Sequence, residues 1–254
     1  MMNAAPRRLP IDMVVRRSFL FAWESRAVLM TPLLIYAGIT ALADLAAMRV
    51  FGVDNQAAIF LITIAEQIFG MAFAVGIHRF VLLAEAPAGF QFFRWDRHFV
   101  QYVVVALLLL VMAASALLMA VGALGGDPTA QSPAVSGIGA LFSLFVMVFA
   151  ALILSRFSLA LPATALGDPV RPRQIWQMTG GNGWRLLATA MLVVLPFVML
   201  DSALNIQIIG AGGIAKIVLV ALLRLIVAAQ LVVTTIMLSL SYDVLIRGGG
   251  PTPR

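Results

Sequence analysis

Six long apolar stretches alternate with polar segments along the chain. The apolar stretches lie near 27–49, 57–78, 100–122, 135–155, 186–208 and 214–238, and the polar or glycine-rich segments between them lie at 52–56, 85–98, 125–133, 167–184 and 210–213. An α-helix needs about 20 predominantly apolar residues to cross the ~30 Å hydrocarbon core of a bilayer. The pattern therefore predicts an all-α polytopic membrane protein with six transmembrane helices, which form a single integral membrane domain over residues 1–254.

The composition agrees with this pattern. Hydrophobic residues make up 62% of the 254 positions and charged residues only 11%, less than half of the roughly 25% charged residues of soluble chains. A solvated domain is therefore excluded. The chain has no cysteine, which excludes disulfides, thiolate metal sites, iron–sulfur clusters and a cysteine nucleophile. No cofactor and no metal are expected.

Arginine lies mostly on one side of the predicted helices. It precedes the first stretch, occurs in the second and fourth connections and ends the chain, whereas the other side holds only Arg49 and Lys216. Because Lys and Arg are retained in the cytoplasm, both termini are predicted to be cytoplasmic, in the bacterial inner membrane. The net charge of +6 is thus interpreted as a topology signal, and no nucleic-acid partner is expected. A cleaved signal peptide is rejected because the apolar run from Ala27 exceeds the 7 to 15 residues of its apolar region.

Short motifs recur around the predicted helices. Arg-Phe-x-Leu follows the second stretch at 79–82 and the fourth at 156–159, and Trp with Arg precedes the first, third and fifth stretches. The segments 13–23, 89–99 and 174–184 mix arginine with apolar residues and are interpreted as cytoplasmic interfacial helices. The repeat predicts three parallel in-out-in hairpins around a pseudo-threefold axis, in units of about 10–84, 85–168 and 169–247. The alternative is a chance recurrence, since 241–243 does not repeat the motif.

Six arginines of these segments are predicted to contact lipid headgroups. They are Arg16, Arg17, Arg94, Arg97, Arg171 and Arg173. Cations next to a membrane helix attract the anionic phospholipids of the cytoplasmic leaflet. The expected partners are therefore the lipid bilayer, anionic phospholipids and a possible membrane-protein partner.

One region resembles a known family. The pattern runs from Arg156 through Pro162 to Gly167, continues with Ile-Trp-Gln-Met-Thr at 175–179 and ends with the glycine turn before Trp184 and Arg185. It resembles the membrane domain associated with bacterial glycerophosphodiester phosphodiesterases and related uncharacterised six-span inner-membrane proteins. In that family the activity belongs to a separate soluble barrel domain. The resemblance therefore implies the membrane module alone, and no catalytic residue carries over.

Motifs for catalysis are missing from the chain. It contains no Gly-x-Ser-x-Gly elbow, no phosphate-binding lysine loop and no pair of histidines at metal-ligand spacing. His78 and His98 are interpreted as interfacial polar residues. The glycine-rich stretch 180–183 could offer N–H groups to a phosphate, but a flexible turn is the preferred interpretation. No enzyme activity is predicted.

Four charged residues interrupt the apolar stretches: Asp44, Glu66, Asp201 and Arg224. Each lies ten to thirteen residues from the nearest outer turn, so all four are expected at a similar depth in the outer half of the membrane. Charges at this depth normally face the interior of a helix bundle. Asp201 is predicted to pair with Arg224, and Asp44 with Arg49 or Lys216. Glu66 is then left over, either to hold a proton or bind a cation, or to form a hydrogen bond with a neighbour such as Gln230.

Two functions remain in competition. The first is a non-catalytic scaffold, assembly or regulatory factor, which explains the missing motifs. The second is a small transporter or channel with an intramembrane acidic site, which explains the buried charges. A third, an intramembrane enzyme acting on lipid, lacks an identifiable nucleophile or metal cluster. A closed, paired arrangement of the four charges would favour the first, and a water-connected cavity the second.

Overall fold

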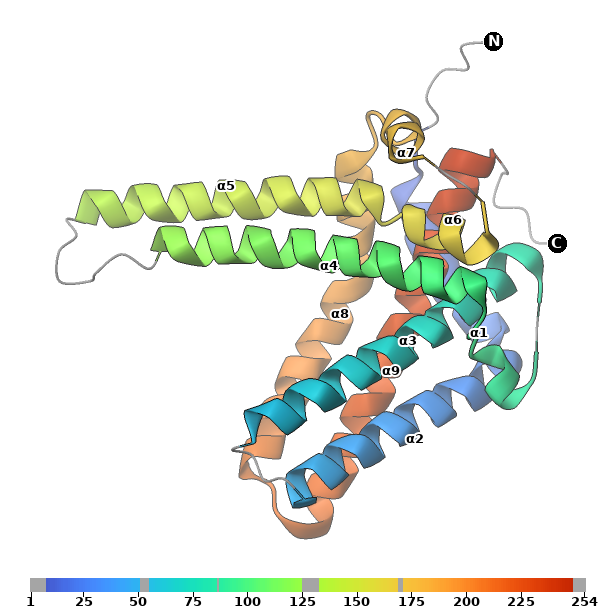
Figure 1. Cartoon of the computed structure of the whole chain (residues 1–254), viewed down its shortest axis with the longest axis vertical. Helices are drawn as coiled ribbons and strands as arrows, with labels where there is room; N and C mark the ends of the chain where they lie inside the picture. The colour runs from blue at the N-terminus through green and yellow to red at the C-terminus, as the bar shows by residue number, and fades with distance from the viewer. Residues whose placement is uncertain (1–7, 51–54, 86, 125–132, 169–170, 249–254) are drawn as a thin grey trace.

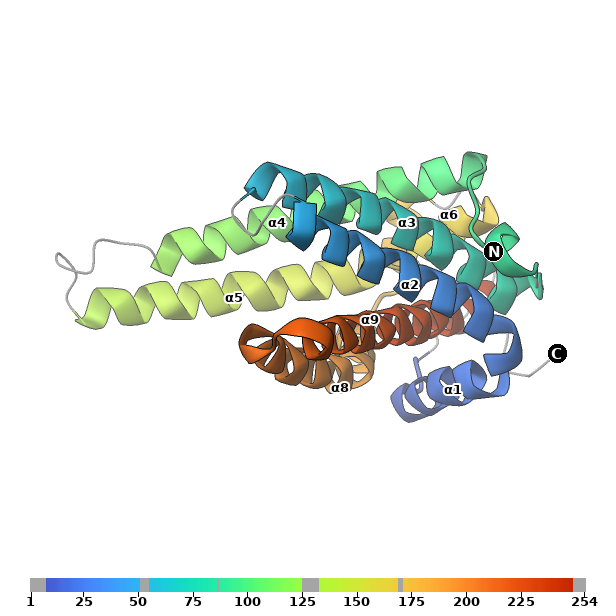
Figure 2. The same ribbon diagram turned by 90° about the horizontal axis from the view of Figure 1, so that it is seen from below.

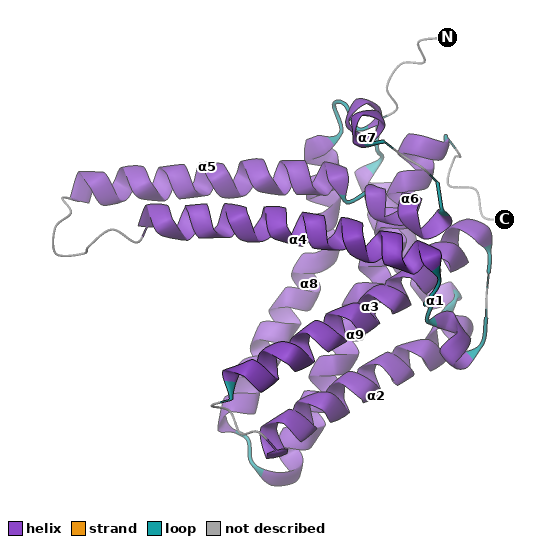
Figure 3. Ribbon diagram, viewed as in Figure 1, coloured by secondary structure: helices purple, strands orange, loops and turns teal. Residues whose placement is uncertain are grey.

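The computed structural model describes residues 8–50, 55–85, 87–124, 133–168 and 171–248. These residues form helices and contain no β-strand (Figure 3). Six helices are long and apolar enough to cross a membrane: α2 (Arg26–Val50), α3 (Gln56–Leu83), α4 (Arg97–Leu124), α5 (Pro133–Phe157), α8 (Gly183–Gly210) and α9 (Gly213–Tyr242). The all-α class and the six apolar helices predicted from the sequence are confirmed.

Shorter helices lie before, between and after the long helices, at one end of the molecule. They are α1 (Ile11–Glu24), the 3-10 turn η1 (Gly89–Phe92), α6 (Ala160–Leu166), α7 (Pro172–Met178) and the π-helical turn η2 (Asp243–Arg247). The segment 13–23 lies within α1, whereas 89–99 is divided between η1 and the start of α4, and 174–184 between α7 and the start of α8. Of the three segments, only the first is therefore one continuous helix.

Local chemistry explains where several helices begin and end. The side chain of Asn55 accepts the backbone N–H of Ala58 at the start of α3, and Asp96 accepts those of His98 and Phe99 at the start of α4. Such side chains satisfy N–H groups that the first helical turn leaves unpaired. Pro162 lacks an N–H group, and the chain turns at Ser158 before α6 resumes the helix.

The long helices do not form the predicted symmetric bundle. Consecutive helices pack as the pairs α2 with α3, α4 with α5, and α8 with α9. Helix α9 also packs against α1, α2 and α3, whereas the pair α4–α5 extends away from the other long helices (Figures 1 and 2). Asp44 of α2, Glu66 of α3 and Arg224 of α9 form ion pairs between these three helices, whereas no ion pair among the described residues involves α4 or α5.

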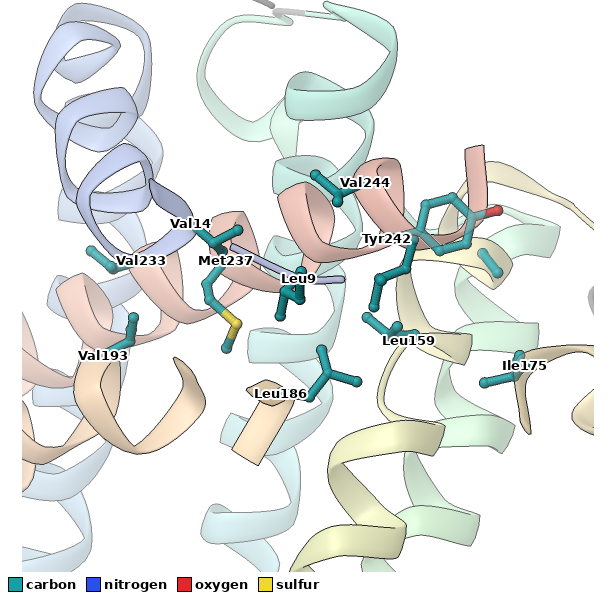
Figure 4. Close-up of a cluster of buried hydrophobic side chains, with 12 residues drawn as sticks. Leu9, Val14, Leu159, Ile175, Leu186, Val193, Val233, Met237, Tyr242 and Val244 are labelled. Carbon is teal, nitrogen blue, oxygen red and sulfur yellow. The ribbon is translucent and has the colours of Figure 1, made fainter. Parts of the chain in front are cut away.

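Three apolar clusters hold the helices together where they converge, and the smallest joins α3, α4 and α6 through Val75, Tyr102 and Ala165. Figure 4 shows the first, in which Leu9 and Val14 meet Leu186 of α8 and Met237 and Tyr242 of α9. The second joins α2, α3, η1 and α9 through stacked and edge-on aromatic rings such as Phe73 and Phe92. These clusters bring the beginning and the end of the described chain to the same end of the molecule (Figure 1).

Candidate functional site: an intramembrane charge cluster

Three of the four intramembrane charges meet between α2, α3 and α9. The guanidinium of Arg224 donates from Nε to Oδ2 of Asp44 and from Nη2 to Oδ1, both at 2.5 Å. The same Nη2 lies 3.0 Å from Oε2 of Glu66. The side chains of Arg224, Asp44 and Glu66 are 19%, 22% and 10% exposed. We call these three residues the charge cluster.

The helix faces explain how the charge cluster assembles. Arg224 shares one stripe of α9 with Ala228 and Val232, because residues four apart lie on the same helix face. Ala228 and Val232 are buried against α2 and α3. Glu66 lies one turn before Gly70 on the face of α3 toward α2, where Tyr36 covers Gly70. The three charges therefore lie on the faces along which their helices pack.

Asp201 does not belong to the charge cluster. Its carboxylate accepts a hydrogen bond from Nδ2 of Asn205, one turn later in α8, at 3.2 Å. None of the ion pairs among the described residues includes it. The predicted pair of Asp201 with Arg224 is therefore wrong, and so is the prediction that Glu66 lacks a partner. Counting residues from the outer turns placed all four charges at a similar depth in the membrane. Depth does not specify which face of α9 carries Arg224 or which neighbour that face meets.

The charge cluster contains two carboxylates and a single guanidinium. It carries one net negative charge if both carboxylates are ionised and none if one of them holds a proton. Within the described ranges, no group of three His, Cys, Asp or Glu side chains is placed to hold a metal ion. Arg224 contacts both acids directly, so the three residues form a mutually paired set.

The predicted headgroup arginines fall into two groups. Arg94 donates to Oε2 of Glu85 at 2.6 Å, and Arg17 lies 3.3 Å from Oε2 of Glu24, so both are engaged within the chain. The other four are exposed and take part in no ion pair among the described residues: Arg16, Arg97, Arg171 and Arg173. The second group has its charge available for lipid.

Glu85, in the segment that follows α3, is paired with two arginines. Arg79 of α3 donates to both of its oxygens, at 2.9 and 2.7 Å, and Arg94 approaches from the segment after η1. The hydrogen bonds from Arg79, followed by the positive charges of Arg79 and Arg94, lower the pKa of Glu85. Nothing in the sequence motifs singled out Glu85.

The two histidines differ from their interpretation as interfacial residues. His78 is fully buried, and its Nδ1 lies 2.8 Å from Oγ of Ser239 on α9. His98 packs against Gly167, where a Cβ would lie 2.4 Å from Cε1 of the ring. Both imidazoles thus fill closely packed contacts between helices. Ser239 was not singled out from its sequence position, since a serine in an apolar helix is common.

The turn at 180–183 is occupied by the protein itself. The side chain of Asn182 accepts the backbone N–H of Leu9 at 2.9 Å, and Arg185 donates to the carbonyl of Leu9 at 2.8 Å. Arg156 donates to Oγ1 of Thr179 just before the turn. These contacts make the stretch a docking point for the N-terminal segment.

Comparisons with known proteins identify no relative. The chain matches no family model, no curated protein and no solved structure. The resemblance of 156–185 to the membrane domain of bacterial glycerophosphodiester phosphodiesterases thus stays a prediction. The functional argument therefore depends on the residues of this chain alone.

Proposed function

We propose that this integral membrane protein is a non-catalytic scaffold, assembly or regulatory factor of the bacterial inner membrane, with both termini in the cytoplasm. The observation that supports the proposal is the mutual pairing within the charge cluster. Arg224 contacts Asp44 through two hydrogen bonds and Glu66 through a third contact, so these charges hold α9 against α2 and α3. Charges that serve helix packing need no substrate and no water path.

The pair α4–α5 supports a role in assembly. Its helices extend away from the rest of the molecule (Figure 1) and expose large apolar side chains such as Leu118 on α4 and Leu141 on α5, at 73% and 70%. Little of α4 and α5 is needed to bury the protein's own core, so their surfaces are available to lipid and to a neighbouring membrane protein. A membrane scaffold needs a surface of this kind.

A flux measurement tests the absence of transport. The purified protein is reconstituted into vesicles that contain a pH-sensitive dye, and a proton gradient and a membrane potential are applied. We expect proton flux equal to that of protein-free vesicles, for the native chain and for Glu66→Gln alike. Flux that requires the protein and falls in Glu66→Gln would contradict the proposal.

That result would support the second candidate, a transporter coupled to protons. One observation favours it: the charge cluster has one carboxylate more than its single guanidinium can neutralise. Such a site can take up and release a proton if it becomes accessible to water. Gradients of candidate solutes would then be applied in the same vesicles to find the transported species.

Photo-crosslinking tests the assembly role in the membranes of the native host. A photoreactive amino acid replaces Leu118 or Leu141, and Phe60 of α3, which is 65% exposed, serves as the matched control. We expect one defined protein adduct from α4–α5 and only lipid adducts from position 60. Lipid adducts alone from every exposed position of α4–α5 would exclude this pair as an assembly surface.

Reporter fusions test the proposed topology. Alkaline phosphatase is active only outside the cytoplasm, so a fusion at residue 130 is expected to be active and fusions at residues 90 and 175 inactive. The proposal depends on the arginine asymmetry of the sequence. The reverse pattern of activity would overturn it.

A further inference from the structure

An apolar groove lies where α1, α2 and α9 meet, away from the charge cluster. Its volume is about 230 Å³. Phe19 and Trp23 of α1, Leu29 and Leu33 of α2, and Ala229 and Val232 of α9 are among the side chains that line it. Arg26 is the one charged residue in its lining.

Arg26 is expected at the depth of lipid headgroups when α2 spans the bilayer. It is the first residue of the apolar span that continues along α2. The groove follows α2 from Arg26 to Leu33, seven residues further into the membrane, which corresponds to about 10 Å along the helix axis. The groove therefore begins at a cation and continues beside the hydrocarbon region.

The charge of Arg26 has no carboxylate partner among the described residues. The nearby Glu24 is paired with Arg17, at 3.3 Å. No ion pair among the described residues involves Arg26. One N–H of Arg26 donates to the carbonyl of Trp23, and its guanidinium lies 4.7 Å from the centre of the Trp23 ring. A guanidinium has five N–H donors, so the contact with Trp23 orients the group and leaves donors for an anion.

We propose that this groove binds one phospholipid with an anionic headgroup. The lipid phosphate accepts hydrogen bonds from Arg26, and the first part of an acyl chain lies along the groove between α2 and α9. An apolar transmembrane helix of a partner does not suit the site, because it would cover the charge of Arg26 without supplying an anion. The site is separate from the six arginines predicted from the sequence and is independent of the scaffold proposal.

Trp23 provides the probe for the experiment. The chain has four tryptophans, and replacement of Trp95, Trp176 and Trp184 by phenylalanine leaves Trp23 as the one fluorophore. This variant is reconstituted with increasing fractions of phosphatidylglycerol that carries bromine on its acyl chains, or of brominated phosphatidylcholine. Bromine quenches only tryptophan in close contact, so quenching reports the occupancy of the groove.

We expect half-maximal quenching at a clearly lower fraction of phosphatidylglycerol than of phosphatidylcholine. Arg26→Gln should reduce this preference about 5-fold, which corresponds to the ~1 kcal/mol that one cation contributes near an anionic leaflet. Arg247→Gln, which changes an exposed arginine that is outside the groove and is not one of the six predicted headgroup arginines, should leave it unchanged. An equal preference for the two lipids, or equal losses in the two variants, would overturn the proposal.

A second pair of variants tests the acyl-chain half of the site. Ala229→Leu fills the groove and should weaken quenching by both brominated lipids, whereas Ala221→Leu, on an exposed position of the same helix, should not. If Ala229→Leu leaves quenching intact, the acyl chain does not lie in the groove. If Trp23 is shielded from both lipids whatever residue stands at position 26, a protein segment covers the groove and the proposal is wrong.

Discussion

Replacing Arg224 with methionine should be the most destabilising single change in the charge cluster. Methionine preserves much of the apolar length of the side chain but leaves Asp44 and Glu66 without a cation, although their side chains are only 22% and 10% exposed. Removing one partner of a buried ion pair costs about 3–5 kcal/mol, because the remaining charge has lost its compensation. We expect Arg224→Met to lower the free energy of unfolding by that amount.

The two acids should respond less and unequally. Asp44→Asn removes the negative charge and one of the two hydrogen bonds of 2.5 Å but leaves Arg224 paired with Glu66, so a loss of about 1.5–3 kcal/mol is expected, as for a hydrogen bond to a charged group. Glu66→Gln removes the excess negative charge while its amide oxygen can still accept from Arg224, and the expected loss is about 1 kcal/mol or less.

Equilibrium unfolding in SDS, followed by tryptophan fluorescence, measures these differences in detergent micelles. Asp201→Asn is the matched control, since it also neutralises an intramembrane carboxylate but one whose hydrogen bond is to Asn205. The triple variant Arg224→Met, Asp44→Asn, Glu66→Gln should regain part of the stability that Arg224→Met loses, because no uncompensated charge remains. If Arg224→Met costs no more than Asp201→Asn, Arg224 does not hold the three helices together.

Two further predictions concern the opposite end of the molecule. Gly76→Ala should lower the free energy of unfolding by about 1–3 kcal/mol, since the added Cβ would lie 2.1 Å from the carbonyl oxygen of Phe92; thermal unfolding measures this, and an unchanged stability would refute the close approach. The lowered pKa of Glu85 contributes stability above its unfolded pKa of about 4.5, and this contribution should disappear as the pH falls through the folded pKa. Glu85→Gln should flatten this part of the unfolding profile below pH 5, and an unchanged acid dependence would show that Arg79 and Arg94 do not stabilise the carboxylate.

The apolar pattern was sufficient to predict the six long helices. Each transmembrane helix is specified by its own run of about 20 residues, a local property that sequence alone reveals. The π-helical turn at Asp243 was not predicted, because it depends on packing against other segments. The six long helices are thus specified locally, whereas the end of α9 also depends on tertiary packing.

The composition of the charge cluster shows that the depth of a residue in the membrane does not determine its partner. Asp44, Glu66 and Arg224, which were singled out from the sequence as charges that need partners, pair with one another. Their pairing depends on which helices α9 contacts, and that contact is made by buried apolar residues such as Ala228 and Val232. The symmetric arrangement failed for the same reason: repeated sequence motifs at the helix ends do not determine which helix faces pack together.

The contact between Arg224 and the two acids can form only late in the synthesis of the chain. Arg224 follows Asp44 by 180 residues and Glu66 by 158. At a synthesis rate of about 5–20 residues per second, α2 and α3 exist for roughly 10–40 s before their cation has been made. During that interval both carboxylates are in the membrane or its insertion machinery without a positive partner, a costly state in hydrocarbon. A nascent chain that stops before α9 would keep both carboxylates unpaired. These unpaired carboxylates distinguish an unfinished copy from a finished one, and membrane quality control could recognise them.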